Sequence, residues 1–275
     1  RNYLAAVDAD QYVVDPAAGW REAGFTATDL VAAEPSRLLG RLSRVLSGPG
    51  DDAWRQRWTD ADAAHASVLE ESDGFCEGRL LADVVELAPE PSTLFVSNSM
   101  PVRDLDRFGA PTTASLTALG NRGASGIDGI TSTALGAGSA ATDDLTLVTG
   151  DLAYYHDMNG LAALERCGVD ATIVLVNNDG GGIFHMLPIE AHDPPFTSQF
   201  VTPHGLAFDP TADLYDLSFA RIDGGDRAAF RDAYAEATAA AGSHVVEVRT
   251  DAEASHRVRE RLRERAVDRV LESTA

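Results

Sequence analysis

Short apolar runs alternate with segments of helical periodicity along most of the chain. The clearest run is 171–176 (ATIVLV), and 145–149 (LTLVT) is a second. Runs this short and this rich in β-branched residues are typical of strands that are buried on both faces of a sheet. On the same grounds we predict strands at 93–96, 114–119, 219–222 and 244–248, and helices at 80–87, 126–141, 159–165, 227–240 and 253–270.

This order of elements predicts the fold class of residues 71–275. Buried strands that alternate with helices indicate a doubly wound α/β domain with a parallel sheet. Ligands of such sheets bind beyond the carboxyl ends of the strands, so we expect the chemistry there. The last helix carries charges of both signs, which we interpret as a solvated face, at Arg257, Arg259, Glu260, Arg261, Arg263 and Glu264.

The first part of the chain has a different pattern. A short strand is expected at 11–14, and 34–46 carries apolar residues at helical spacing. The segment 47–52 (SGPGDD) is the best candidate for a linker. Residues 1–48 are too few to bury a core of their own, so we interpret them as the tail of a central α/β domain. Residues 49–70 would then form a linker and a helix.

The charge of the chain narrows the range of partners. Acidic residues number 43 and basic residues 22, which gives a net charge of −21, and every basic residue is Arg. This balance argues against nucleic acid and against an anionic membrane surface. An acid-rich chain without Lys is typical of salt-loving organisms, because molar salt screens self-repulsion beyond roughly 3 Å. High-GC codon usage is the alternative explanation for the missing Lys.

No targeting or membrane segment is recognisable, so we expect a protein of the cytoplasm. The sequence contains no charged and apolar leader and no apolar run long enough to span a bilayer. Cys76 and Cys167 lie far apart without a CxxC pattern, which excludes a disulfide scaffold and a cysteine metal site. The seven histidines form no ligand pattern; we interpret His156, which follows Asp151 on a predicted helix, as a solvated or packing residue rather than a pocket residue, and we assign no role to His204.

Polar residues directly follow two of the predicted strands. Gly150 and Asp151 end the run 145–149, and an Asn-Asn-Asp-Gly-Gly-Gly stretch begins at Asn177. Parallel strands present their carboxyl ends at one edge, so we expect these two loops to meet. A carboxylate, an amide oxygen and a main-chain carbonyl suit Mg²⁺, and helix N-termini suit phosphate. Each motif alone is typical of a turn or helix cap, but together they predict a metal–diphosphate site.

These motifs resemble those of a known family. Gly150-Asp151, followed after 153–176 by Asn177-Asn178, resembles the GDG-x(n)-NN motif of thiamine diphosphate (ThDP) enzymes, with Leu152 in place of the usual third Gly. The segments SNSMPVR at 97–103, NRGASGIDG at 121–129 and NNDGGGIF at 177–184 are similar to the MenD family. Its members are the 2-succinyl-5-enolpyruvyl-6-hydroxy-3-cyclohexene-1-carboxylate synthases of menaquinone biosynthesis. The resemblance runs over most of the chain, and NRGASGIDG is its most specific part.

The resemblance implies roles for residues at the matched positions. Mg²⁺ would be held by Asp151, Asn178 and the carbonyl of Gly180. ThDP would contact Asn98, Ser99, Ile127, Gly150, Asp151, Leu152, Ala153, Ile183 and Phe184, with Ile127 beneath the bent cofactor. Substrates would contact Ser99, Arg103, Arg122 and Leu187. The two arginines suit this role because both substrates are polyanions, which a chain of charge −21 can hold only with local guanidinium groups.

The family also implies a reaction. ThDP and Mg²⁺ would support decarboxylation of 2-oxoglutarate and 1,4-addition of the resulting carbanion to isochorismate. The Glu that activates the cofactor lies in an N-terminal pyrimidine-binding domain in this family, and no segment here resembles that domain. We therefore expect a C-terminal part of a longer protein, or one of two subunits, without a catalytic residue of its own and inactive alone. The resemblance further implies a homo-oligomer.

Three alternatives remain open. A different ThDP enzyme, such as a 2-oxo acid decarboxylase or acetolactate synthase, is disfavoured by Leu152 and by the segment 121–129. A non-catalytic remnant or assembly subunit is disfavoured by the intact Asp151 and Asn178. A nicotinamide dehydrogenase would explain the G-x-G-x-x-A pattern at 136–141, but no strand precedes it. Close packing of a helix through small residues is the better interpretation of that pattern.

Overall fold

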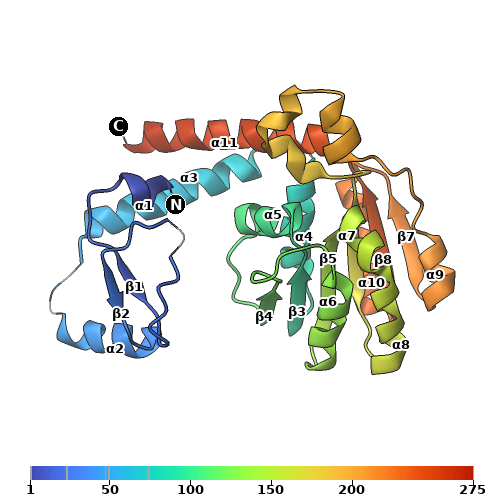
Figure 1. Cartoon of the computed structure of the whole chain (residues 1–275), viewed down its shortest axis with the longest axis horizontal. Coiled ribbons are helices and arrows are strands. Elements are labelled where there is room, and N and C mark those ends of the chain that lie inside the picture. The colour runs from blue at the N-terminus through green and yellow to red at the C-terminus, as the bar shows by residue number, and fades with distance from the viewer. Residues whose placement is uncertain (1, 23, 47, 49, 73–74, 275) are drawn as a thin grey trace. The chain divides into compact units, whose positions relative to one another are not determined.

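The computed structural model describes residues 2–22, 24–46, 48, 50–72 and 75–274. The chain divides into two compact units, Arg1–Thr59 and Asp60–Ala275 (Figure 1). Ser47 and Pro49 of the predicted linker lie outside the described residues. Helix α3 (Asp52–Glu70) belongs in part to each unit.

The first unit is small and has no buried core among its described residues. It contains α1 (Asn2–Ala6), a parallel pair of strands β1 (Tyr12–Val14) and β2 (Asp29–Val31), and α2 (Pro35–Val45). Helix α2 begins where Glu34 accepts the amide proton of Arg37 at 2.8 Å and Pro35 takes the first turn. The strand and the helix predicted in this part are confirmed. Its assignment to a central domain stays a prediction.

The second unit is built on one parallel sheet of six strands in the order β4-β3-β5-β6-β8-β7. Every neighbouring pair is parallel, which confirms the predicted doubly wound α/β class. The strands are β3 (Ser92–Val96), β4 (Leu116–Leu119), β5 (Asp144–Gly150), β6 (Thr172–Asn177), β7 (Ser218–Ile222) and β8 (His244–Arg249).

Helices cover both faces of this sheet (Figure 1). In β6, Ile173 and Leu175 belong to one apolar core, and Val174 and Val176 to the other. This explains the continuous apolar run, because successive side chains point to opposite faces that are both buried. One core includes α6 (Ile130–Ser139), α7 (Asp151–Asp157) and α8 (Ala163–Cys167); the other includes α4 (Glu77–Leu87), α5 (Met100–Phe108) and α10 (Arg227–Ala239).

Short helical turns complete the unit. They are η1 (Met158–Ala162), η2 (Gly182–Met186), η3 (Pro188–Ala191), η4 (Thr197–Val201) and α9 (Pro210–Tyr215). The G-x-G-x-x-A pattern lies at the end of α6, where a Cβ on Gly138 would come within 2.7 Å of Leu145 Cδ2. The small residue is thus required by helix packing against the sheet, as predicted.

The long C-terminal helix α11 (Ala252–Thr274) corrects one expectation. Arg259 was assigned to a solvated face, but it is only 4% exposed and forms ion pairs with Glu77 and Asp104. Two further residues of α11, Leu262 and Ala266, are buried in a third apolar cluster. Among the helices of the described chain, none is both long and apolar enough to cross a membrane.

Candidate functional site

The carboxyl ends of three neighbouring strands, β3, β5 and β6, define the site. Gly150, the last residue of β5, pairs with Val176 of β6, so Asp151 and Asn178 follow adjacent strand ends. A cavity of about 360 Å³ lies at this edge. All but one of the residues assigned to cofactor, metal or substrate line it, namely Asn98, Ser99, Arg103, Arg122, Ile127, Gly150, Asp151, Leu152, Ala153, Asn178, Gly180, Ile183 and Phe184.

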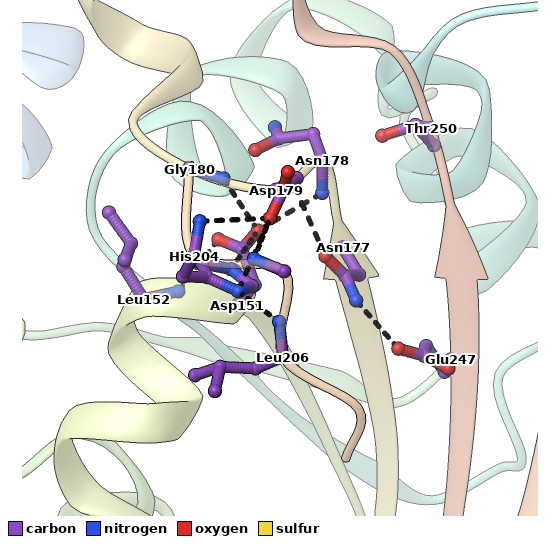
Figure 2. A network of polar contacts seen from close by, with 12 residues as sticks. Asp151, Leu152, Asn177, Asn178, Asp179, Gly180, His204, Leu206, Glu247 and Thr250 are labelled. Atoms are coloured by element: carbon purple, nitrogen blue, oxygen red, sulfur yellow. Dashed lines mark hydrogen bonds and ion pairs between the residues drawn. The ribbon is translucent and has the colours of Figure 1, made fainter. Parts of the chain in front are cut away.

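Asp151 is the first residue of α7 and is only 2% exposed. Its Oδ2 accepts hydrogen bonds from the amides of Gly180 at 2.9 Å and Asn178 at 3.2 Å (Figure 2). Its Oδ1 accepts one, from the amide of Leu152 at 2.7 Å, and keeps a free lone pair. Burial raises the pKa of Asp151 above its ordinary value, although the hydrogen bonds from Gly180 and Leu152 oppose this. A cation bound at this position would offset the burial of the negative charge.

His204 contacts the same carboxylate, a contact that no pattern in the sequence predicts. Its Nδ1 accepts from the amide of Leu206 at 3.0 Å, which leaves Nε2 as the nitrogen that can donate. Nε2 then donates to Asp151 Oδ2 at 3.2 Å. The main-chain amide of His204 donates to Asp179 Oδ1 at 3.0 Å, and this bond holds the residue in position. The same Asp179 oxygen lies 3.3 Å from His204 Nδ1. His204 therefore orients Asp151 from a loop that no local motif identifies.

Asn178 presents an unsatisfied acceptor beside Asp151. Its Nδ2 donates to Glu77 Oε1 at 2.7 Å. Its Oδ1 is buried and has no hydrogen-bond partner within the part of the chain that the structure describes. A buried acceptor without a donor is rare in proteins and points to a ligand, for which a cation is suited.

Gly180 occupies a position that only glycine can take. Its φ is +147°, and a Cβ would lie 2.2 Å from the carbonyl oxygen of Val201. Its own carbonyl accepts from the amide of Gly182 at 3.0 Å and has a second lone pair. No group of three or more His, Cys, Asp or Glu suited to a metal occurs among the described residues. One carboxylate with two neutral oxygens, at Asp151, Asn178 and Gly180, fits Mg²⁺, which takes its other ligands from water and phosphate.

The opposite wall of the cavity comes from the loop after β3 and from the segment 121–129. Ser99 precedes α5 with φ +70° and ψ −131°, a strained conformation for a residue other than glycine. Its carbonyl accepts from Arg103 Nη1 at 2.6 Å. Asn98 bridges to the other segment, because its Nδ2 donates to the carbonyl of Gly126 at 2.9 Å and its Oδ1 accepts from Arg122 Nη1 at 2.8 Å.

The positive charges of Arg103 and Arg122 are not neutralised by a carboxylate in the described ranges. Arg103 and Arg122 are exposed at the cavity, and neither forms an ion pair with a carboxylate in the described ranges. Each uses Nη1 for a neutral oxygen. Their guanidinium groups can therefore receive an anion without first breaking an ion pair.

Apolar residues form another part of the wall, with one departure from expectation. Ile183 and Phe184 line the cavity, and the ring of Phe184 packs edge-on against Phe200 at 5.5 Å. Leu187 does not line it. This residue follows η2 in an extended conformation, φ −106° and ψ 149°, which carries it to a neighbouring cavity of about 350 Å³. Its substrate contact stays a prediction.

Comparisons with known proteins identify the family to which the chain is similar. The family described as "Thiamine pyrophosphate enzyme, C-terminal TPP binding domain" matches residues 110–248. The chain is 60% identical to the 2-succinyl-5-enolpyruvyl-6-hydroxy-3-cyclohexene-1-carboxylate synthase of Haloquadratum walsbyi, over 99% of this chain and 50% of the relative. Proteins of the same name are 57% identical in Haloarcula marismortui (98% and 45% covered) and 45% identical in Roseiflexus castenholzii (85% and 40% covered).

The chain spans about half the length of these curated relatives. A solved structure, the benzoylformate decarboxylase of Polynucleobacter necessarius, matches 64% of this chain and 33% of its own with a TM-score of 0.51. At 17% identity this likeness supports the fold alone. Several relatives come from halophilic archaea, in agreement with the acid-rich composition.

Proposed function

Because the chain belongs to the thiamine pyrophosphate enzymes, with 2-succinyl-5-enolpyruvyl-6-hydroxy-3-cyclohexene-1-carboxylate synthases as relatives, we propose that its cavity binds the Mg²⁺–diphosphate part of ThDP. The observation that carries this proposal is the buried Oδ1 of Asn178, which has no donor in the described chain and belongs to a residue whose main-chain amide donates to Asp151 Oδ2. The donor set matches the preference of Mg²⁺ for oxygen.

The residues of this chain would bind and orient the cofactor. Asp151, Asn178 and the carbonyl of Gly180 would hold Mg²⁺, and amides at the start of α7 and around Ser99 would bind phosphate oxygens. Ile127, Ile183 and Phe184 would exclude water from its apolar part. When bound, ThDP supplies the means to stabilise a carbanion, and the protein supplies position and electrostatics.

For the whole protein, the proposed activity is decarboxylation of 2-oxoglutarate followed by 1,4-addition to isochorismate, as the resemblance of the motifs to the MenD family implies. Arg103 and Arg122 would bind substrate carboxylates, which is supported by guanidinium groups that line the cavity and, within the described chain, bond only to neutral oxygens. The Glu that activates the cofactor would come from a pyrimidine-binding domain outside this chain, in a homo-oligomer. This chain alone would bind the cofactor's diphosphate end and would not turn over.

Calorimetric titration of the chain with ThDP in molar KCl tests the site. We expect binding with Mg²⁺, none with EDTA, and none for Asp151→Ala with Mg²⁺. Asp144→Ala is the matched control, because Asp144 is exposed at the opposite end of the same strand. Absence of binding by the folded wild-type chain would overturn the proposed site.

Substitution of Arg122 tests the substrate role in the complete enzyme. Arg122→Ala is expected to raise the apparent KM for an anionic substrate about tenfold or more and to leave ThDP binding nearly unchanged. Arg166→Ala, which does not line the cavity, is the control. An unchanged KM would remove Arg122 from the site. Product analysis with 2-oxoglutarate and isochorismate separates this function from that of another 2-oxo acid decarboxylase.

A further inference from the structure

We propose that Glu77 is a positioning residue, which turns the side-chain amide of Asn178 so that its oxygen, and not its nitrogen, is offered to the metal. This role rests on the function proposed above for Asn178. Glu77 is the first residue of α4, is only 2% exposed and lines the same cavity. No sequence motif points to it.

Three donors surround the Glu77 carboxylate. Oε1 accepts from Asn178 Nδ2 at 2.7 Å and from Thr250 Oγ1 at 2.9 Å. Oε2 accepts from Arg259 Nη2 at 2.6 Å. Arg259 is buried as well, and its Nε donates to Asp104 Oδ1 at 2.8 Å. All three groups that face the Glu77 carboxylate are hydrogen-bond donors, so both of its oxygens act as acceptors.

This acceptor determines how the amide of Asn178 is turned. The two ends of an asparagine amide have nearly the same shape but opposite hydrogen-bonding character. The end that meets Glu77 must be the NH₂ group, since an oxygen there would lie against the carboxylate oxygen. Oδ1 is then directed away from Glu77, and this is the buried atom for which the described chain offers no donor. Mg²⁺ would bind that oxygen and would be repelled by NH₂.

The surrounding backbone keeps the amide at this position. A Cβ on Gly182 would lie 2.7 Å from Asn178 Nδ2 and 3.3 Å from Ala252 Cβ, so the amide packs directly against the glycine main chain. Because the side-chain amide of Asn178 cannot shift toward Gly182, its main remaining freedom is a rotation that exchanges the oxygen and the NH₂ group. Partners that orient a metal ligand in this way change metal affinity by about 10- to 100-fold when removed.

The test compares two substitutions that remove one negative charge from the same buried cluster. Glu77→Gln replaces the partner of Asn178, whereas Asp104→Asn is the matched control, because Asp104 pairs with Arg259 without a hydrogen bond to Asn178. The new glutamine would turn its oxygen to Arg259 and its NH₂ to Asn178, which favours the reversed amide. Binding of Mn²⁺ in the presence of ThDP is followed by electron paramagnetic resonance in molar KCl.

We expect Glu77→Gln to raise the Kd for Mn²⁺ about 10- to 100-fold, and Asp104→Asn to raise it less than about threefold. A pair swap gives a second test that does not depend on stability of the single variant. Asn178→Asp combined with Glu77→Gln restores one donor and one acceptor at the contact, keeps an oxygen for the metal and preserves the net charge. Its Kd is expected to return to within about tenfold of wild type.

Two results would overturn the positioning role while leaving the metal site intact. These are equal Kd values for Glu77→Gln and Asp104→Asn, both shown to be folded by thermal unfolding, or a pair swap that binds no better than Asn178→Asp alone. A wild-type chain that binds no Mn²⁺ with ThDP would instead overturn the proposed function, and the positioning role with it.

Discussion

The imidazole of His204 donates from Nε2 to Asp151 Oδ2 over 3.2 Å, although 53 positions separate the two residues in the chain. The contact is largely shielded from solvent, and the ring also packs edge-on against Phe208 at 5.7 Å. Asp151 thus accepts hydrogen bonds from its own helix, from the loop after β6 and from the loop that contains His204.

Replacement of His204 is expected to weaken the metal site without unfolding the chain. His204→Phe keeps a ring against Phe208 but removes the donor to Asp151, so the Kd for Mg²⁺ with ThDP should rise about tenfold. Calorimetry in molar KCl measures this. His192→Phe, at an exposed position, is the control, and an equal Kd for both variants would contradict the role of His204.

Gly180→Ala is expected to lower both stability and metal binding. The new Cβ would lie 2.2 Å from the Val201 carbonyl at φ +147°, so the loop that follows Asn178 must shift. The cost in free energy of unfolding should be about 2–4 kcal/mol. Gly168→Ala at φ +61°, where a Cβ meets nothing within 4 Å, isolates the backbone strain alone and should cost about 1–2 kcal/mol. Denaturant unfolding compares the two, and equal losses would argue against the close contact.

Arg259 should be the arginine whose loss most strongly destabilises α11. Arg259→Met leaves Glu77 and Asp104 buried without their cation, and the free energy of unfolding should fall by about 3–5 kcal/mol. Arg269→Met removes an ion pair with Glu71 at the surface and should cost at most about 1 kcal/mol. Urea unfolding of both variants measures the difference. Similar losses of unfolding free energy for the two variants would mean that the buried cluster of Arg259, Glu77 and Asp104 stabilises the protein no more than a surface ion pair does.

The surface ion pair between Arg231 and Glu86 should make a small, pH-dependent contribution to the free energy of unfolding. The hydrogen bond from Arg231 lowers the pKa of Glu86 below its ordinary value of 4.5, and partial burial opposes this. The stabilisation from this pair is therefore present above pH 4.5 and is lost as the pH falls through the lowered pKa. Glu86→Gln should cost about 0.5 kcal/mol at pH 7, because the pair is largely exposed, and almost nothing at acidic pH. Unfolding of both proteins between pH 7 and 3 measures this, and a constant difference would contradict it.

The pattern of the sequence was sufficient to predict the sheet and the meeting of two loops. Strands such as 171–176 are recognisable because burial on both faces leaves a continuous apolar run. Once β5 and β6 are parallel neighbours, Asp151 and Asn178 must follow adjacent strand ends. Gly180, whose backbone conformation requires glycine, lies in the segment 177–184, which also carries part of the resemblance to the family. Local sequence was therefore sufficient to predict which strand ends form the candidate site.

The partners that orient these groups were decided by the tertiary structure. Glu77 lies 101 positions from Asn178, and Arg259 lies 182 positions from Glu77. In the sequence, Arg259 is one of several charges on a helix, and only packing distinguishes it as buried. Leu187 was likewise carried to another cavity by a change of backbone direction. Periodicity reports which face of an element is apolar, but the pairing of buried polar groups depends on how distant elements pack together.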